Sequence, residues 1–133
     1  MDTIVRIQPD DLFAFPGLHA GVRVGHLLFV SGQVPLGPAG ELVGTGDFRM
    51  QAEQVFANLG SVLAAGGSGF DRLVKLTAFF VDISRDLPVY REVRDQYIVA
   101  DHAPASSVVQ VAKLFQPAVW LEVEAVAVCG STR

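Results

Sequence analysis

Two glutamates stand two residues apart in an apolar stretch near the end of the chain. The stretch WLEVEAVAV, residues 120–128, alternates in a way that predicts a β-strand. Because side chains alternate across a strand, Glu122 and Glu124 share one face and stand roughly 7 Å apart. The opposite face consists of Val119, Leu121, Val123, Ala125 and Ala127. Either the carboxylate face meets water, or one carboxylate is kept for proton transfer in an interface or cleft.

Other polar side chains give weaker signals of chemistry. In FVSGQ, Ser31 precedes Gly32 without the GxSxG elbow of serine hydrolases, but the glycine indicates close approach by a ligand or another chain. Arg91 and Arg94 could bind an anion, although with their acidic neighbours a solvated helix face is the preferred interpretation. Three histidines lack metal-ligand spacing, so no metal is expected; they are His19, His26 and His102.

Composition limits the possible partners. We expect one domain, residues 1–133, because no repeat or linker divides the sequence. Half of the residues are hydrophobic and only 18% are charged, so a monomer would expose apolar surface and a homo-oligomer is expected. A net charge of −4 without a cluster of Lys and Arg argues against nucleic acid as a partner.

The same composition indicates a cytoplasmic protein. The single cysteine, Cys129, permits no internal disulfide, fits a reducing compartment and is interpreted as a small apolar core residue. The N-terminal residues lack the features of a signal peptide. No apolar stretch approaches the roughly 20 residues of a membrane span, so no membrane association is expected.

Apolar periodicity predicts an α+β fold. Strands are predicted at residues 3–7, on both sides of a Gly25–His26 turn, and at residues 73–82, 106–113 and 119–128. One helix is predicted from Asp47 to Gly66–Gly67, and a second helix is expected to open with Asp86 and Pro88. These elements predict two helices on one face of a single β-sheet. The other face needs a partner, which agrees with the expected oligomer.

Taken together, these motifs resemble the RidA/YjgF family, also labelled endoribonuclease L-PSP. The matching stretches follow the family's order from Arg23 to Val128 and read RVGHLLFVSGQVPLGPAGEL, QAEQVFANLGSVLAAGGSGFDRLVKLTAFFVDI, YREVRDQYIV, HAPASSVVQVAKL and LEVEAVAV. The resemblance implies a chorismate-mutase-like fold and a homotrimer with ligand clefts between subunits. It also implies hydrolysis of reactive enamine/imine intermediates to 2-keto acids and ammonia, with a small-molecule metabolite as partner and no cofactor.

The resemblance also assigns roles to individual residues. Glu124 matches the glutamate thought to act on the attacking water, so burial in the cleft is expected to raise its pKa, while Glu122 is given a supporting or solvent role. Ser31 and Gly32 match the serine-glycine pair whose backbone faces the ligand. The other matched substrate-binding positions are Leu18 or His19 for a cleft tyrosine, Arg91 for an asparagine, and Ser106, followed by Ser107, for the carboxylate-binding arginine.

Ser106 is the main departure from the family pattern and places the chain in a subgroup without the catalytic arginine. Serine offers one neutral hydrogen bond where a guanidinium grips a carboxylate at two points. Loss of a hydrogen bond to a charged group costs about 1.5–3 kcal/mol, so capture of a keto-acid imine would weaken at least about tenfold. We hypothesise that Arg91, or Lys113 of a neighbouring subunit, supplies the anion contact instead.

Three functions follow from this reading. The first is a deaminase-type hydrolase of enamines or imines with altered substrate choice. The second is a trimer that binds a small metabolite without turning it over, which the missing arginine favours for the usual substrate. The third is the endoribonuclease of the family's older label, which an acidic chain without a histidine pair for acid/base cleavage makes the weakest.

Overall fold

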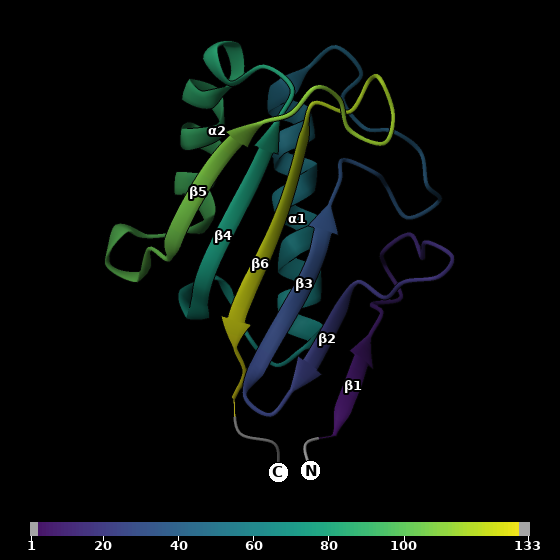
Figure 1. Ribbon diagram of the computed structural model, residues 1–133, viewed down its shortest axis with the longest axis vertical. Helices are drawn as coiled ribbons and strands as arrows, with labels where there is room; N and C mark the ends of the chain where they lie inside the picture. Colours follow the sequence, from purple (N-terminus) through teal and green to yellow (C-terminus); the bar gives the residue numbers. More distant parts are fainter. Residues whose placement is uncertain (1–2, 131–133) are drawn as a thin grey trace.

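A mixed six-stranded sheet forms one layer of the molecule and two helices form the other (Figure 1). The computed structural model describes residues 3–130. The strands are β1 (Ile4–Ile7), β2 (Gly21–Val24), β3 (Leu27–Gln33), β4 (Leu73–Phe80), β5 (Ala105–Gln110) and β6 (Leu121–Val128). They lie in the order β1-β2-β3-β6-β4-β5, and β4 and β5 pair in parallel while the other neighbours pair antiparallel.

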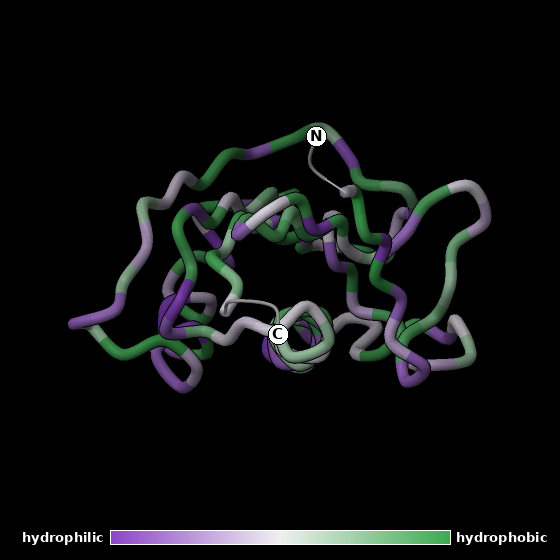
Figure 2. Tube along the Cα trace, turned by 90° about the horizontal axis from the view of Figure 1, so that it is seen from below, coloured by the Kyte–Doolittle hydropathy of each residue, from purple (hydrophilic) through white to green (hydrophobic). Residues whose placement is uncertain are grey.

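Both helices cover the same face of the sheet, as the sequence predicts. They are α1 (Phe48–Ala65) and α2 (Ile83–Tyr97), and the short 3₁₀ helices η1 (Phe70–Arg72) and η2 (Ala100–His102) precede β4 and β5. In the end-on view of Figure 2, α1 is seen along its axis on one side of the sheet. No helix within residues 3–130 is both long and apolar enough to cross a membrane.

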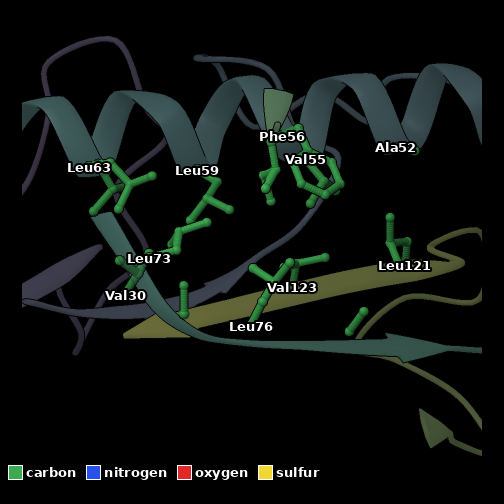
Figure 3. Close-up of a cluster of buried hydrophobic side chains, with 14 of the residues drawn as sticks. Val30, Ala52, Val55, Phe56, Leu59, Leu63, Leu73, Leu76, Leu121 and Val123 are labelled. Carbon is green, nitrogen blue, oxygen red and sulfur yellow. The ribbon is translucent and has the colours of Figure 1, made fainter. Parts of the chain in front are cut away.

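The core lies between α1 and the central strands. Figure 3 shows Val55, Phe56 and Leu59 of α1 pointing toward Leu76 of β4 and Val123 of β6, and all five side chains are fully buried. The alternation predicted for the last strand is confirmed, because the side chains of its helix-facing set are at most 5% exposed: Leu121, Val123, Ala125 and Ala127. Burial of this apolar face therefore fixes the direction in which the intervening glutamates point.

The ends of α1 agree with the sequence-based prediction. The Asp47 side chain accepts a hydrogen bond from the Met50 backbone N–H at 3.1 Å, so it caps the first turn. Gly66 ends the helix, and Gly67 follows with a φ of +80°, a left-handed conformation that glycine adopts without strain.

The start of α2 differs from the prediction. The helix begins at Ile83, with Asp82 as N-cap, so Asp86 ends its first turn and Pro88 lies further inside it. The Asp82 side chain accepts from the Arg85 N–H at 3.1 Å, and this earlier cap determines the boundary. Asp86 is only 3% exposed and its carboxylate accepts two hydrogen bonds from the Arg85 guanidinium, so it serves packing rather than helix initiation.

The opposite face of the sheet is bare in the protomer, as expected. Leu27 and Phe29 of β3 are 40% and 45% exposed, and Val126 and Val128 of β6 lie on the same face, partly exposed. All six residues of the edge strand β5 are exposed as well. Glu122 and Glu124 also lie on this face, since they alternate with the buried residues of β6.

Candidate functional site

An irregularity in β3 creates the centre of the site. Val30 pairs with Ala125 and Gln33 pairs with Val123, so Ser31 and Gly32 together lie opposite Glu124, the single residue between those partners. Two residues against one is the pattern of a β-bulge, which bends its strand and takes the extra residue out of the ladder. The bulge therefore separates the Ser31–Gly32 backbone from regular pairing with β6.

The bulge lies directly beneath the carboxylate of Glu122. A Cβ built on Gly32 would collide with Oε2 of Glu122, and with its Cδ and Cγ. Only a residue without a side chain leaves this space free. The close approach that the glycine indicated is therefore made by Glu122 of the same chain.

Ser31 joins the bulge to the segment that precedes β2. Its Oγ donates a hydrogen bond to the His19 carbonyl at 2.7 Å, and its backbone N–H donates to the Ala20 carbonyl at 2.9 Å. These bonds hold the neighbouring Leu18 at the site, where it lines the pocket with its side chain 49% exposed. His19 contributes its carbonyl to this arrangement and its residue is exposed.

A small pocket opens above Gly32. Its lining consists of Phe15, Leu18, Ser31, Gly32, Val34, Phe115 and Glu122. The rings of Phe15 and Phe115 meet edge to face, with centroids 6.0 Å apart. Within residues 3–130, this lining offers one ionisable side chain, Glu122, and no basic one. The pocket is thus an apolar recess with a single acid.

The pKa of Glu122, the acid in this recess, is raised. Burial raises the pKa of Glu122 above its ordinary value, and the nearby negative charge of Glu124 raises the pKa further. Glu124 is exposed and does not line the pocket. The Glu122 side chain therefore reaches Gly32 and lines the pocket, whereas Glu124, to which the resemblance assigns the catalytic role, lies opposite Ser31 and Gly32 in the strand register but outside the pocket lining.

Ser106 lies elsewhere in the protomer. It is on β5, which β4 separates from β6, the strand of Glu122, by roughly 10 Å at a strand spacing of about 4.8 Å. It lines a second pocket together with Arg94, whose Nη2 is 2.9 Å from Oδ1 of Asp95. Ser107 accepts a hydrogen bond from Nζ of Lys75 at 2.8 Å. One protomer therefore does not bring Ser106 and Glu122 into one pocket.

Of the two arginines considered in α2, Arg94 is the one near Ser106. Arg91 is exposed and lines neither pocket, whereas Arg94, almost one helical turn further on, lines the Ser106 pocket. At 3.6 residues per turn the two side chains are about 60° apart around the helix axis, and only Arg94 reaches the pocket lining. The sequence alone had no signal for which arginine faces β5.

Comparison with known proteins agrees with this architecture. The sequence model of the family described as Endoribonuclease L-PSP matches residues 13–129. The chain belongs to this family. The resemblance to the RidA/YjgF family, another label for the same group, is thereby confirmed.

The relatives of this chain include a protein named as a deaminase. Protein HMF1 of Saccharomyces cerevisiae is 40% identical over 106 residues, covering 80% of this chain and 79% of the relative. The human 2-iminobutanoate/2-iminopropanoate deaminase is 33% identical over 109 residues, covering 82% and 77%. The crystal structure of E. coli TdcF with bound serine superposes with a TM-score of 0.83 at 32% identity, covering 95% of this chain and 99% of that one.

Two residues of the Glu122 pocket wall were not anticipated from the sequence. Phe15 and Phe115 come from loops about 100 residues apart in the chain, and nothing in their local sequence marks them as neighbours.

Within residues 3–130, no group of three or more His, Cys, Asp or Glu residues is arranged to hold a metal ion.

Proposed function

We propose that this chain is a cofactor-free hydrolase of reactive enamine or imine intermediates, in which Glu122 transfers the proton. The observation that carries the proposal is the Glu122 carboxylate, seated over Gly32 in an apolar recess that raises its pKa. A raised pKa suits a carboxyl group to exchange protons near neutral pH. The relative named 2-iminobutanoate/2-iminopropanoate deaminase supports the reaction type.

The proposed chemistry needs only one acid and one water. Glu122 accepts a proton as water adds to the carbon of the C=N bond, which gives a carbinolamine. Glu122 then returns the proton to nitrogen, the C–N bond breaks as the Glu122 carboxylate takes the hydroxyl proton, and that proton passes to the released ammonia, so that the products are a carbonyl compound and an ammonium ion. An apolar recess favours this sequence because low polarity strengthens the carboxylate's interaction with the iminium charge.

The proposal includes a homotrimer with clefts between subunits. The exposed Leu27 and Phe29 on the bare sheet face support an assembly that covers them. In such an assembly Ser106 of one subunit would face the Glu122 pocket of the next, which is consistent with their separation in one protomer. Serine in place of a carboxylate-binding arginine would then alter substrate choice.

A cytoplasmic location remains part of the proposal, on the strength of the single cysteine.

Ammonia release tests the proposal. An amino-acid oxidase generates 2-iminopropanoate in situ, and wild type is compared with Glu122→Gln, Glu124→Gln and Ser106→Arg. The control is Glu53→Gln, which removes an exposed carboxylate from α1. We expect Glu122→Gln to lose roughly 10²-fold or more of any acceleration, the size of a general acid/base contribution. Glu124→Gln and Glu53→Gln should each lose less than about threefold, a change of well under 1 kcal/mol.

The outcomes separate the candidate roles. Loss of activity in Glu124→Gln but not in Glu122→Gln would return the catalytic role to Glu124. Activity gained only by Ser106→Arg would mean that the pocket can support hydrolysis of this imine but that the wild-type protein binds a different ligand. Silence of all variants, with the trimer confirmed in solution, would reject hydrolysis of this imine.

A trimer that binds a metabolite without turnover is the second candidate. The observation that favours it is the absence of a basic side chain from the lining of the Glu122 pocket within residues 3–130. An endoribonuclease role is the weakest candidate, because the pocket is acidic and the chain carries a net charge of −4.

A further inference from the structure

We propose that the Glu122 pocket accepts a cationic amine or iminium ligand that bears an apolar group and no carboxylate. This inference rests on the proposed function only in taking the same pocket as the ligand site. It goes beyond that function by naming the charge and shape of the ligand, and it concerns binding rather than turnover.

The charges around the pocket favour a cation. Glu122 lines it, and Glu124 stands next to it on the same face of β6. The nearest basic residue by strand register is Lys75, four residues along β4 from Phe79, which lies opposite Glu122. The Lys75 ammonium already donates to Ser107 Oγ. A positive ligand group would therefore meet the Glu122 carboxylate, with the charge of Glu124 outside the lining adding to the attraction, and a negative group would be repelled by both charges.

The pocket also lacks a free side-chain donor for a carboxylate. Ser31 carries the one hydroxyl in the lining, and its proton is engaged by the His19 carbonyl at 2.7 Å. A carboxylate placed here would lose its water and gain no charged partner from these residues, which is costly. The Ser31 hydroxyl, which could have donated to an anion, is instead bound to the His19 carbonyl and holds the segment before β2 in place.

The walls call for an apolar group on the ligand. Phe115 and Leu18 are 50% and 49% exposed at the pocket, and Phe15 and Val34 complete the wall. Covering such surface is favourable in proportion to the apolar area removed from water. The aromatic rings can also attract a cation through their faces. A ligand of this kind would satisfy the acid and the walls together.

Four small molecules that share a phenyl group and differ in charge test the inference by titration calorimetry. They are 2-phenylethylamine, 2-phenylethanol, phenylalanine and 3-phenylpropanoate. We expect the amine to bind wild type about tenfold tighter than the other three, as a charge-assisted hydrogen bond allows. Phenylalanine is the decisive comparison, because it is the amine with one carboxylate added.

Variants assign the binding to this pocket. Glu122→Gln keeps the shape of the side chain and should weaken the amine about tenfold while leaving the alcohol unchanged. Phe115→Ala, at an exposed position, should weaken the amine and the alcohol alike. Glu53→Gln on α1 is the control and should change neither. Unfolding curves recorded for each variant keep a folding defect distinct from a binding defect.

Two results would overturn the inference. One is binding of phenylalanine or 3-phenylpropanoate as tight as that of the amine, which would indicate a cation supplied to the cleft by a neighbouring subunit. The other is amine binding that survives Glu122→Gln unchanged. Because no turnover is measured, failure of imine hydrolysis leaves this test intact, and failure of amine binding leaves the hydrolysis assay intact.

Discussion

The carboxylate of Glu122 occupies the space that a side chain at position 32 would fill. Glycine at this position and the acid on β6 are therefore two parts of one arrangement. The backbone at Gly32 does not have a positive φ, so the position demands glycine for space and not for conformation.

Gly32→Ala is expected to impair the site while leaving the fold intact. The added methyl group would push aside the end of a flexible side chain, which costs little stability but moves the acid. We expect turnover, or amine affinity, to fall about tenfold to a hundredfold, because small displacements of a reacting group are costly. Gly69→Ala, at an extended glycine outside the pocket, is the control. Equal losses in both variants would contradict the assignment.

Glu122 should make stability depend on pH. Its pKa is raised above the ordinary 4.5 by burial and then by Glu124. The folded state therefore holds this proton longer than the unfolded state, so stability is complete below the ordinary pKa and is lost as pH rises through the folded pKa. Glu122→Gln has no ionisable group at this position, so it should not lose this stability as the pH rises.

Thermal unfolding of this variant checks the sign. The Tm of Glu122→Gln relative to wild type should be higher at about pH 8 than at about pH 4, where the wild-type carboxyl group is protonated in the folded state. The same difference for Glu53→Gln should not rise with pH. A relative Tm that falls with pH would show that the folded state favours the charged form of Glu122.

Gln51→Leu should destabilise the fold by about 2–4 kcal/mol, because it leaves several buried polar groups without partners. The Gln51 side chain is fully buried, donates to the carbonyls of Gly44 and Ala118, and accepts from the Trp120 N–H. It thereby holds the start of β6 against α1. Gln54→Leu, on the same helix and partly exposed, should cost well under half as much. Denaturant unfolding measures both, and equal costs would contradict this role for Gln51.

Phe29→Glu should dissociate the proposed trimer. Phe29 is 45% exposed on the bare sheet face, and three carboxylates brought together in an apolar interface would repel one another. Met50→Glu is the control, because Met50 is 48% exposed on the helical side. Size-exclusion chromatography with light scattering gives the masses. A Phe29→Glu trimer, or a Met50→Glu monomer, would place the interface elsewhere.

The fold could be predicted well because its signals are local. Alternation fixed the faces of β6, and the Asp47 cap with Gly66 fixed the ends of α1. The start of α2 was missed by three residues, because Asp82 and Asp86 are both acceptable near a helix start and only the packed structure buries Asp86.

The site could be predicted only in part. Ser31, Gly32 and Leu18 were identified from the sequence and line one pocket. Glu122 lines the pocket and Glu124 does not, a difference that depends on how the side chains of β6 lie against the bulge in β3, which is a long-range property of the sheet. Phe115 was missed, and Arg91 was preferred over Arg94 as a site residue, for a related reason, since helix rotation and loop packing decide which side chains reach a pocket.

The edge strand β5 has a consequence for the protein in the test tube. It pairs only with β4 among the strands in residues 3–130, and Val108 and Val109 are 38% and 40% exposed. An open strand edge with apolar side chains is a template for irregular pairing between chains. Protomers released from an assembly should therefore precipitate as they are concentrated. If Phe29→Glu dissociates the proposed trimer, the variant should also be less soluble than wild type.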